Sequence, residues 1–335
     1  MNKLTTALLS TLLLLLLPVL STAADREVKK AFTVNPGEQL VVDSERGAIN
    51  VESHSKDTVI IRVEIEGLDD DEFQVSMDYR NGVVEVVGEM EKKLLNWSWG
   101  NRRVRYHLVV PEQFDVDLKT RGGAIDVRDL EGDIEAKTAG GSLGFDGITG
   151  NINGKTSGGS IQIADVSGDV TVKTSGGAIS AKRIEGDLEA RTAGGSIQLA
   201  GISGFAEVAT SGGGINATGV HAGLNAKTAG GSIKAVFNHQ PSADSRLATS
   251  AGSVTALIAS GVALDIDAKG SRVRSELSLE NTTSNRKKSL SGTLNGGGPQ
   301  LKIRTSAGNV RILKSTAQRQ AIKSHSPRRF SGIAL

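Results

Sequence analysis

Apolar and polar residues alternate along most of the chain, in short stretches that end at glycine-containing turns. In the segment 174–191, the apolar set predicted to point inward is Ile179, Ala181, Ile184, Leu188 and Ala190. The polar set predicted to point outward is Ser180, Lys182, Glu189 and Arg191. A spacing of two is the period of a β-strand with one buried face. Because no 3.6-residue stripe is present, the pattern predicts an all-β protein and excludes helical repeats.

The strands recur with a fixed period. Seven threonines are spaced 18 residues apart, at Thr120, Thr138, Thr156, Thr174, Thr192, Thr210 and Thr228. Each is followed by Arg, Ala or Ser and then by two glycines, and a second glycine turn, such as Gly168-Asp169, separates successive threonines. Short strands at a constant period are typical of solenoids, in which stacked coils bury their inner faces together. We therefore expect a parallel β-solenoid with 18-residue coils and glycine corners.

The corners carry structural expectations of their own. We expect positive φ angles at the paired corner glycines, which are Gly140, Gly141, Gly158, Gly159, Gly176, Gly177, Gly194 and Gly195. A ladder of hydroxyl groups just inside these corners is expected from Thr138, Thr156, Thr174, Thr192, Thr210 and Thr228. At the second corner, Asp or Asn should bond its own backbone. On this interpretation, Gly176→Val strains the corner and Ile179→Asp buries an unpaired charge.

The segments around the regular coils, which span 119–236, are interpreted as variants of the same unit. Residues 44–51 and the segments that begin at Thr249 and Thr305 imitate the threonine corner. Residues 69–118 are predicted to form strands that cap the first end of the solenoid or lie beside it. Residues 237–314 are predicted to form irregular coils, with a loop at 281–300 and a closing strand at 300–304. The whole solenoid is expected to span 25–314.

The two ends of the chain differ from the solenoid. Residues 1–24 are typical of a signal peptide, because Lys3 precedes a mainly apolar stretch of 14 residues, Ala7–Leu20, and small residues follow. We expect export to the periplasm or cell surface, with no transmembrane segment after cleavage, since a spanning helix needs about 20 apolar residues. Residues 281–335 contain 11 Lys and Arg and no acid, and 315–335 are predicted to be a basic, disordered tail. Residues 25–280 carry 27 Lys and Arg against 37 Asp and Glu, a net charge of −10.

Three segments resemble a known bacterial family. They are VRYHLVVPEQFDVDLKTRGGAIDV at 104–127, VALDIDAKGSRVRSELSL at 262–279 and LNGGGPQLKIRTSAGNVRILK at 294–314, and the repeated TSGGxI…GDL units accompany them. Over roughly residues 31–314 the chain is similar to the exported β-strand-repeat domains of unknown function that carry the label "putative adhesin". The resemblance implies an exported, right-handed β-helix-like solenoid. It implies no established reaction and supplies no catalytic motif.

One column of outward residues is rich in positive charge. The position before each repeated threonine is Lys119, Lys137, Lys155, Lys173, Arg191, Ala209 and Lys227. Glu135, Glu189 and Glu207 lie on the same face, which favours a solvated surface with partly neutralised charge. The functional alternative is a binding stripe for an anionic polymer such as an acidic glycan, with Lys137, Lys155, Lys173 and Arg191 as the candidate binding residues. Trp97 and Trp99 are predicted either to plug the end of the solenoid or to contact a sugar or a protein.

The sequence shows no arrangement typical of an active site. Asp126, Asp129, Asp133, Glu135 and Asp146 are the densest acidic group of the repeats, but the Asp126 column continues as Gly144 and Gln162. The five histidines have no ligand spacing, and the chain has no cysteine. We therefore expect no catalytic residue, cofactor, metal or nucleic-acid partner.

These observations favour an exported, non-enzymatic adhesin or scaffold that binds a glycan or a protein of the cell envelope. One alternative is a carbohydrate-active enzyme built on a β-helix, whose sign would be carboxylates clustered in one outer groove. Another is an envelope regulatory protein that binds a partner protein. The oligomeric state is open.

Overall fold

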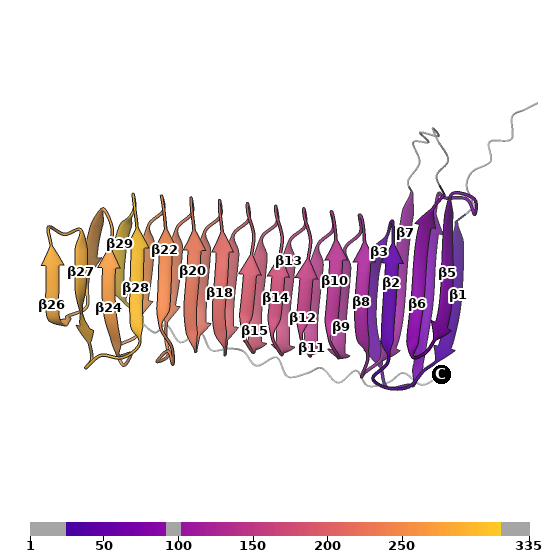
Figure 1. Ribbon diagram of the computed structural model, residues 1–335, viewed down its shortest axis with the longest axis horizontal. Helices are drawn as coiled ribbons and strands as arrows, with labels where there is room; N and C mark the ends of the chain where they lie inside the picture. The colour runs from indigo at the N-terminus through magenta and orange to yellow at the C-terminus, as the bar shows by residue number, and fades with distance from the viewer. Residues whose placement is uncertain (1–24, 92–101, 316–335) are drawn as a thin grey trace, which may run out of the picture.

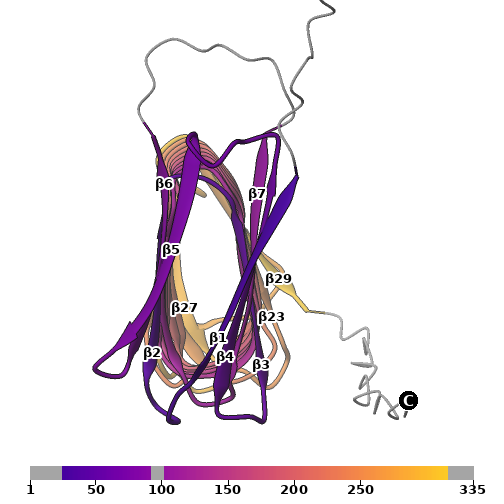
Figure 2. The same cartoon turned by 90° about the vertical axis from the view of Figure 1, so that its right-hand side faces the viewer.

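Strands make up the regular structure of the computed structural model, which describes residues 25–91 and 102–315. They form one sheet of 14 strands and one of 15. The two sheets lie side by side along the whole molecule, with corner turns joining them at top and bottom (Figure 1, Figure 2). The prediction of an all-β fold with mainly parallel sheets is confirmed.

We call the two sheets sheet A and sheet B. The strands of sheet A are β1 (Arg26–Thr33), β3 (Ala48–His54), β4 (Thr58–Glu66), β7 (Arg103–Pro111), β9 (Ile125–Glu131), β11 (Leu143–Thr149), β13 (Ile161–Ser167), β15 (Ile179–Glu185), β17 (Ile197–Ile202), β19 (Ile215–Val220), β21 (Ile233–Phe237), β23 (Val254–Ile258), β25 (Arg272–Ser275) and β29 (Asn309–Lys314). The strands of sheet B are β2 (Gln39–Ser44), β5 (Phe73–Arg80), β6 (Val83–Met90), β8 (Asp115–Thr120), β10 (Ile134–Thr138), β12 (Ile152–Lys155), β14 (Val170–Lys173), β16 (Leu188–Arg191), β18 (Phe205–Thr210), β20 (Gly223–Thr228), β22 (Ser245–Thr249), β24 (Leu264–Lys269), β26 (Glu280–Asn285), β27 (Ser289–Leu294) and β28 (Gln300–Thr305).

Each regular coil contributes one strand to each sheet and pairs with the next coil at a spacing of 18 residues. Ile134 pairs with Ile152, and Ile152 pairs with Val170. The predicted inward residues Ile179, Ala181, Ile184, Leu188 and Ala190 are all buried, at 0–2% exposure. The assignment of inner and outer faces is therefore confirmed for this coil. Parallel pairing in register lets the same side-chain type stack in every coil, which closes a narrow apolar core between the sheets.

The threonine corner is built from contacts between coils. The Thr174 hydroxyl donates a hydrogen bond to the carbonyl oxygen of Gly159 in the preceding coil (2.8 Å) and accepts one from the N–H of Gly177 (3.3 Å). The repeated threonines are buried and make the same pair of bonds in successive coils. The ladder therefore joins each hydroxyl to the neighbouring backbone rather than to another hydroxyl.

The expectation of positive φ at the paired glycines is wrong, because none of the eight has a positive φ. The second glycine of each pair is required for a different reason. A Cβ on Gly177 would lie 2.0 Å from the carbonyl oxygen of Gly159, whereas a Cβ on Gly176 would lie 3.4 Å from its nearest neighbour. Close stacking of backbones, and not turn conformation, therefore excludes a side chain at the second position of the pair.

The second corner also differs from the expectation. The carboxylate Oδ1 of Asp133 accepts a hydrogen bond from the N–H of Asn151 (2.9 Å), and the Asn151 side chain accepts one from the N–H of Asp169 (3.1 Å). These side chains bond the backbone of the next coil and not their own backbone. The residues therefore form a second ladder that runs along the stack.

A third column, which the sequence did not predict, has the left-handed backbone conformation. Asp129, Asp165 and Arg183 have φ angles of 52–53°, and the equivalent residues of other coils include Gly147 and Gly201. The pairing of β9 with β11 skips this position. The left-handed region favours Gly and tolerates Asp. What this column shares is therefore its backbone conformation, which does not require an acidic side chain in every coil.

The coil nearest the N-terminus does not lie at the end of the stack. Strand β2 pairs in parallel with both β6 and β8, and β3 pairs in parallel with both β7 and β9. The coil β2–β3 is therefore held between the later coils β6–β7 and β8–β9. The outermost strands of this end, β1 and β5, pair antiparallel with β4 and β6 (Figure 1). The bulky buried side chains Tyr106 and Phe73 fill the core here.

The other end has the same interleaved arrangement. Strand β28 pairs in parallel with both β22 and β24, and β29 pairs in parallel with both β23 and β25. The prediction of a loop over 281–300 is wrong, because β26 and β27 form an antiparallel hairpin within this range. Strand β26 is polar and exposed along its length. A polar edge of this kind discourages pairing with another chain.

Several expectations lie outside the described residues. They are the signal peptide at 1–24, the tryptophans Trp97 and Trp99, and the tail, of which only Ser315 is described. Within residues 25–91 and 102–315, no helix is long and apolar enough to cross a membrane.

Candidate functional site

The predicted cation column forms a continuous stripe on the outer face of sheet B. Lys119 pairs in register with Lys137, which pairs with Lys155, then Lys173 and then Arg191. Ala209 interrupts the series before Lys227. Lys119 is half-buried, and the later cations are exposed. We call the five cations from Lys119 to Arg191 the cation stripe.

Acidic neighbours neutralise both ends of the cation stripe but not its centre. Lys119 contacts Asp117 at 2.9 Å, Lys137 contacts Glu135, and Arg191 contacts Glu189 at 3.0 Å and Glu207 at 3.3 Å. The Lys137 side chain lowers the pKa of Glu135 through a hydrogen bond.

Lys155 differs from these cations. Asn153 and Thr171 occupy the positions at which neighbouring coils carry acids. No ion pair of the described residues involves Lys155, and Lys173 reaches Glu189 at 3.1 Å. A groove of about 270 Å³ runs beside Lys119, Lys137 and Lys155 at the threonine corner.

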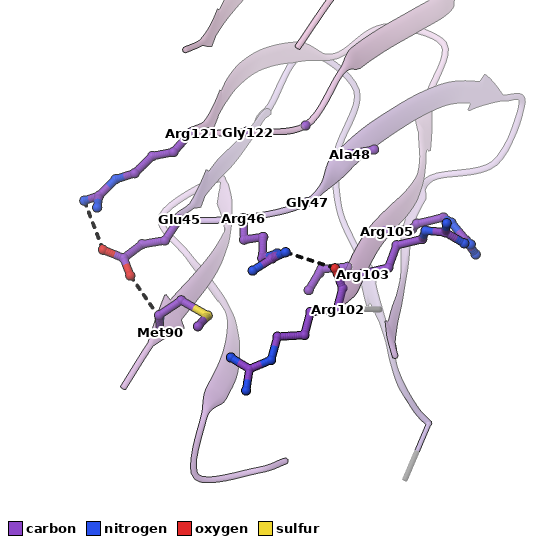
Figure 3. A pocket seen from close by; sticks show the side chains of 12 residues that line it. Glu45, Arg46, Gly47, Ala48, Met90, Arg102, Arg103, Arg105, Arg121 and Gly122 are labelled. Atoms are coloured by element: carbon purple, nitrogen blue, oxygen red, sulfur yellow. Dashed lines mark hydrogen bonds and ion pairs between the residues drawn. The ribbon is translucent and has the colours of Figure 1, made fainter. Parts of the chain in front are cut away.

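A second positively charged hollow lies where the first coils of the stack meet. It has a volume of about 580 Å³ and is lined by the corner residues Glu45–Ala48 and Arg121–Gly123, by Met90, and by Arg102–Arg105 (Figure 3). Figure 3 shows the Arg46 and Arg102 side chains between these segments, whereas Arg103 and Arg105 extend to the other side. We call this hollow the arginine pocket.

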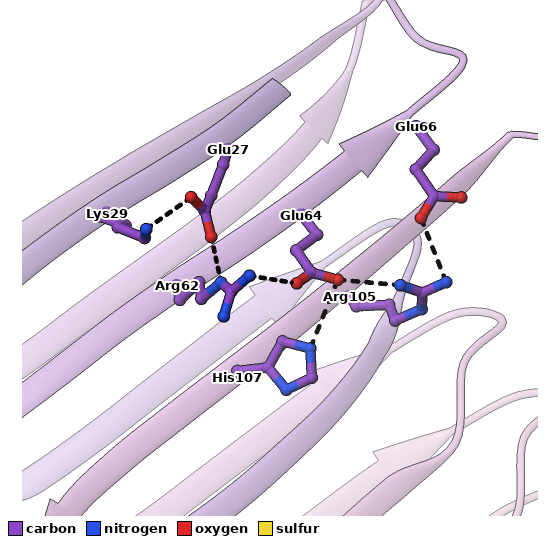
Figure 4. Close-up of polar contacts among 7 residues, drawn as sticks. All are labelled: Glu27, Lys29, Arg62, Glu64, Glu66, Arg105 and His107. Carbon is purple, nitrogen blue, oxygen red and sulfur yellow. Dashed lines mark hydrogen bonds and ion pairs between the residues drawn. The ribbon is translucent and has the colours of Figure 1, made fainter. Parts of the chain in front are cut away.

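Beside the arginine pocket, the outer face of sheet A carries a network of ion pairs. Glu64 accepts a hydrogen bond from Arg105 (2.9 Å) and also contacts Arg62 (2.8 Å) (Figure 4). Glu27 and Lys29 extend the network onto β1, and Glu66 contacts Arg105 at 3.2 Å. Arg103 also contacts Glu66 (3.6 Å), so three acids face four cations across β1, β4 and β7. The hydrogen bond from Arg105 lowers the pKa of Glu64, with further lowering by Arg62 and His107. Because each of these acids is held by a cation of its own or a neighbouring strand, we interpret the network as a connection between strands.

Sheet A carries a small groove of about 190 Å³ on the regular coils. Its charged lining residues are Asp126, Arg128, Asp146 and Lys182. Asp126 is half-buried, and burial raises its pKa while Arg128 acts to lower it. A Cβ on Gly144 would lie 2.2 Å from Oδ1 of Asp126, so a side chain at this position would require the carboxylate to move. The groove is the arrangement nearest to an active site among the described residues, although no three of their His, Asp or Glu side chains are grouped to hold a metal ion.

The repeat pattern of the sequence predicts the cation stripe but not the arginine pocket. A signal for it was present, because Arg121 occupies a corner position that holds Ala or Ser in the later coils. Arg46 stands two residues after Ser44, which pairs in register with Thr120, so it takes the place of the first glycine of the corner. A long cationic side chain at a corner position that otherwise holds Gly, Ala or Ser indicates that this corner differs in its surface charge from the others.

The fold and its surfaces define the class of the protein as a β-solenoid with charged outer faces and tightly stacked corners. The chain belongs to the Toastrack DUF4097 family, whose model matches residues 37–313. The resemblance drawn from the sequence is therefore confirmed. No curated protein matches the sequence.

Solved structures with low sequence identity are similar to this chain. One is of a "putative adhesin" from Bacteroides fragilis, with 12% identity, a TM-score of 0.40, and coverage of 87% of this chain and 97% of that chain. Another is of a "putative lipid binding protein" from Parabacteroides distasonis, with 14% identity, a TM-score of 0.39, and coverage of 87% and 97%. A third is of a "putative adhesin" from Parabacteroides distasonis, with 12% identity, a TM-score of 0.34, and coverage of 86% and 97%.

Proposed function

We propose that the protein is an exported, non-enzymatic binding module of the cell envelope that holds an anionic glycan along the cation stripe. Such a module would act as an adhesin or a scaffold. The signal-like residues 1–24 support export, and the right-handed winding of the coils stays a prediction. The observation that carries the proposal is the unbroken register of five cations from Lys119 to Arg191.

The spacing of the cation stripe suits a polymer. Coils stack about 4.8 Å apart, so five cations span roughly 20 Å. A row of this length can face several charges of one polyanion, whereas a small ion would contact one or two residues. Lys155 at the centre has no carboxylate partner among the described residues, so an incoming anion need not displace an existing ion pair there. Electrostatic attraction of this kind is screened by salt.

The test is retention on an immobilised acidic polysaccharide such as polygalacturonate at low salt. The variant Lys137→Gln/Lys155→Gln/Lys173→Gln removes three charges from the cation stripe and should elute at clearly lower salt than the wild type. The matched control, Lys182→Gln/Lys234→Gln/Lys314→Gln, removes three exposed charges from sheet A. Equal losses in both variants would mean that net charge alone retains the protein, and the cation stripe would then have no specific role.

A carbohydrate-active enzyme is the second candidate, and the groove that contains Asp126 is the observation that favours it. A carboxyl group with a raised pKa can act as a general acid, and Asp146 would supply a second carboxylate. Incubation with a panel of acidic polysaccharides, followed by an assay for reducing ends or unsaturated products, tests this function. Product release that is lost in Asp126→Asn would replace the binding proposal with an enzymatic one.

A further inference from the structure

The arginine pocket contains a guanidinium group with unused binding capacity. Arg46 is half-buried, and its side chain donates to the backbone carbonyl oxygen of Arg102 (3.0 Å). No ion pair among the described residues links Arg46 to a carboxylate. A guanidinium has five N–H donors in a planar fork. Most of the donors of Arg46 have no partner among residues 25–91 and 102–315 and can bind a ligand in the hollow that this side chain faces (Figure 3).

Two further arginines reinforce the positive character of the arginine pocket. Arg102 contacts Glu72 (2.9 Å) through one terminal nitrogen, but its buried Nε has no hydrogen-bond partner. Arg121 contacts Glu45 (3.0 Å) at the rim. Arg46, Arg102 and Arg121 thus face the two carboxylates of Glu45 and Glu72, which leaves an excess of one positive charge.

A backbone N–H also lines the arginine pocket. At the corners of later coils, the N–H of the first glycine donates to the preceding coil, as Gly158 does to Ala139 (3.1 Å) and Gly176 does to Ser157 (2.9 Å). Gly122 makes no such bond, and neither does Gly140 in the next coil. The corner of Gly122 still stacks closely on the corner of Arg46, because a Cβ on Gly123 would lie 1.8 Å from the carbonyl oxygen of Gly47. The N–H of Gly122, which lines the arginine pocket, therefore has no backbone partner among the described residues.

We propose that the arginine pocket is a binding site for a single oxyanion of the phosphate or sulfate type, held mainly by the guanidinium of Arg46 with help from Arg102 and Arg121. Guanidinium groups bind such anions through paired, charge-assisted hydrogen bonds. Glu45 is the opposing charge, because its carboxylate lines the hollow and is held by Arg121 and by the N–H of Met90 (3.0 Å). This site is distinct from the cation stripe and does not depend on the proposed function.

The experiment is isothermal titration calorimetry of the full chain with inorganic phosphate at low ionic strength. We expect saturable binding at one site, weakened about tenfold or more in Arg46→Gln, since a charged hydrogen-bonding partner is lost. Arg46→Lys should bind more weakly than the wild type because it keeps the charge but loses the planar fork. Glu45→Gln should bind at least as tightly as the wild type, since the opposing charge is removed. Lys155→Gln, which alters the cation stripe, is the matched control and should bind as the wild type does.

The design separates loss of binding from loss of folding. Arg46 occupies a corner position at which other coils hold glycine or alanine, so Arg46→Gln should melt as the wild type does in the absence of phosphate. Titration with glucose 6-phosphate then distinguishes the source of the anion, because tighter binding than inorganic phosphate indicates a phosphate group carried by a sugar. Absence of phosphate and sulfate binding in the wild type, or equal affinity in Arg46→Gln, would overturn the proposal. Retention on polygalacturonate should not require Arg46, so the two proposals can fail independently.

Discussion

At the scale of single residues, the paired glycines of the threonine corner have unequal roles. The second glycine of each pair has a backbone carbonyl 1.9–2.0 Å from the position that a Cβ would occupy, as at Gly177 and Gly195. The first glycine has only ordinary contacts. The chain itself shows this tolerance, because Ala251 and Ala307 stand at the first position in the corners that begin at Thr249 and Thr305. The expectation that Gly176→Val strains the corner stays a prediction, but the closer contact lies at Gly177.

We predict that Gly177→Ala destabilises the protein by several kcal/mol, because a Cβ there overlaps the carbonyl oxygen of Gly159 and the backbones must separate. Gly176→Ala, its matched control, should change the free energy of unfolding by less than about 1 kcal/mol, because the new methyl group makes only ordinary contacts and reduces the freedom of the unfolded chain. Urea denaturation followed by circular dichroism measures both. Equal stabilities of the two variants would show that the stacking of the corners is not as close as described.

At the scale of elements, cross-strand ion pairs connect the antiparallel strands at the N-terminal end. Glu64 on β4 bonds Arg105 on β7, while Arg62 on β4 contacts Glu27 on β1. Strand β4 pairs antiparallel with both β1 and β7, and β1 and β4 do not belong to the parallel coils. The ladders of the corners do not extend to these two strands. Ion pairs connect these neighbouring strands, whereas hydrogen bonds from the threonine and Asp/Asn side chains connect neighbouring coils in the rest of the stack.

We predict that Glu64→Gln lowers stability at pH 7 by about 0.5–1 kcal/mol, the usual range for a partly exposed ion pair. The folded protein lowers the pKa of Glu64 below its ordinary value of 4.5. The contribution of Glu64 is therefore present above pH 4.5 and is lost as the pH falls through the lower, folded-state pKa. Thermal melts between pH 3 and pH 7 should show the variant and the wild type converging at low pH.

Glu85→Gln on the outer face of β6 is the control for this pH series. Glu85 is exposed and has no ion pair among the described residues. Its substitution should leave the difference from the wild type small at every pH. A constant difference for Glu64→Gln across the whole range would rule out the ion pair as the source of its stabilisation.

At the scale of the whole molecule, both ends of the stack are closed by interleaving. The coil β2–β3 lies between two coils that follow it in the sequence, and β28–β29 lies between two coils that precede it. Each of these coils therefore has parallel neighbours on both sides. The coil nearest each end of the chain therefore cannot detach alone, because it is paired with a coil on either side.

We predict that deletion of residues 300–335 unfolds or aggregates the C-terminal part of the solenoid, since it removes β28–β29 and leaves β22–β23 and β24–β25 without their shared partner. Deletion of residues 316–335 alone is the matched control and should preserve the fold. Size-exclusion chromatography and hydrogen exchange distinguish the two proteins. A monomeric protein with native melting after the larger deletion would show that the interleaved coil is dispensable.

Much of the architecture could be predicted from the sequence, but some local conformations could not. The 18-residue period and the alternating faces identified the coils, and the segment from Ile179 to Ala190 is buried as expected. The left-handed column was missed because Asp129, Gly147 and Arg183 share a backbone conformation and no common side chain. The cation stripe was found because its members share one position in the repeat. Arg46 and Arg102 come from different segments without a common period, so the arginine pocket was not predicted.

The sequence by itself determined the strand period, the inward or outward direction of the side chains and the register of the regular coils. The reason is that a constant 18-residue repeat with a two-residue alternation allows only one stacking in which all the apolar residues are buried. Only the tertiary structure decided the order of the coils at the two ends, the reason for each corner glycine and the meeting of Arg46 with Arg102. These features depend on which strand edges meet and how closely the backbones stack. A strand pattern states which face is buried, but it does not state which partner lies at either edge.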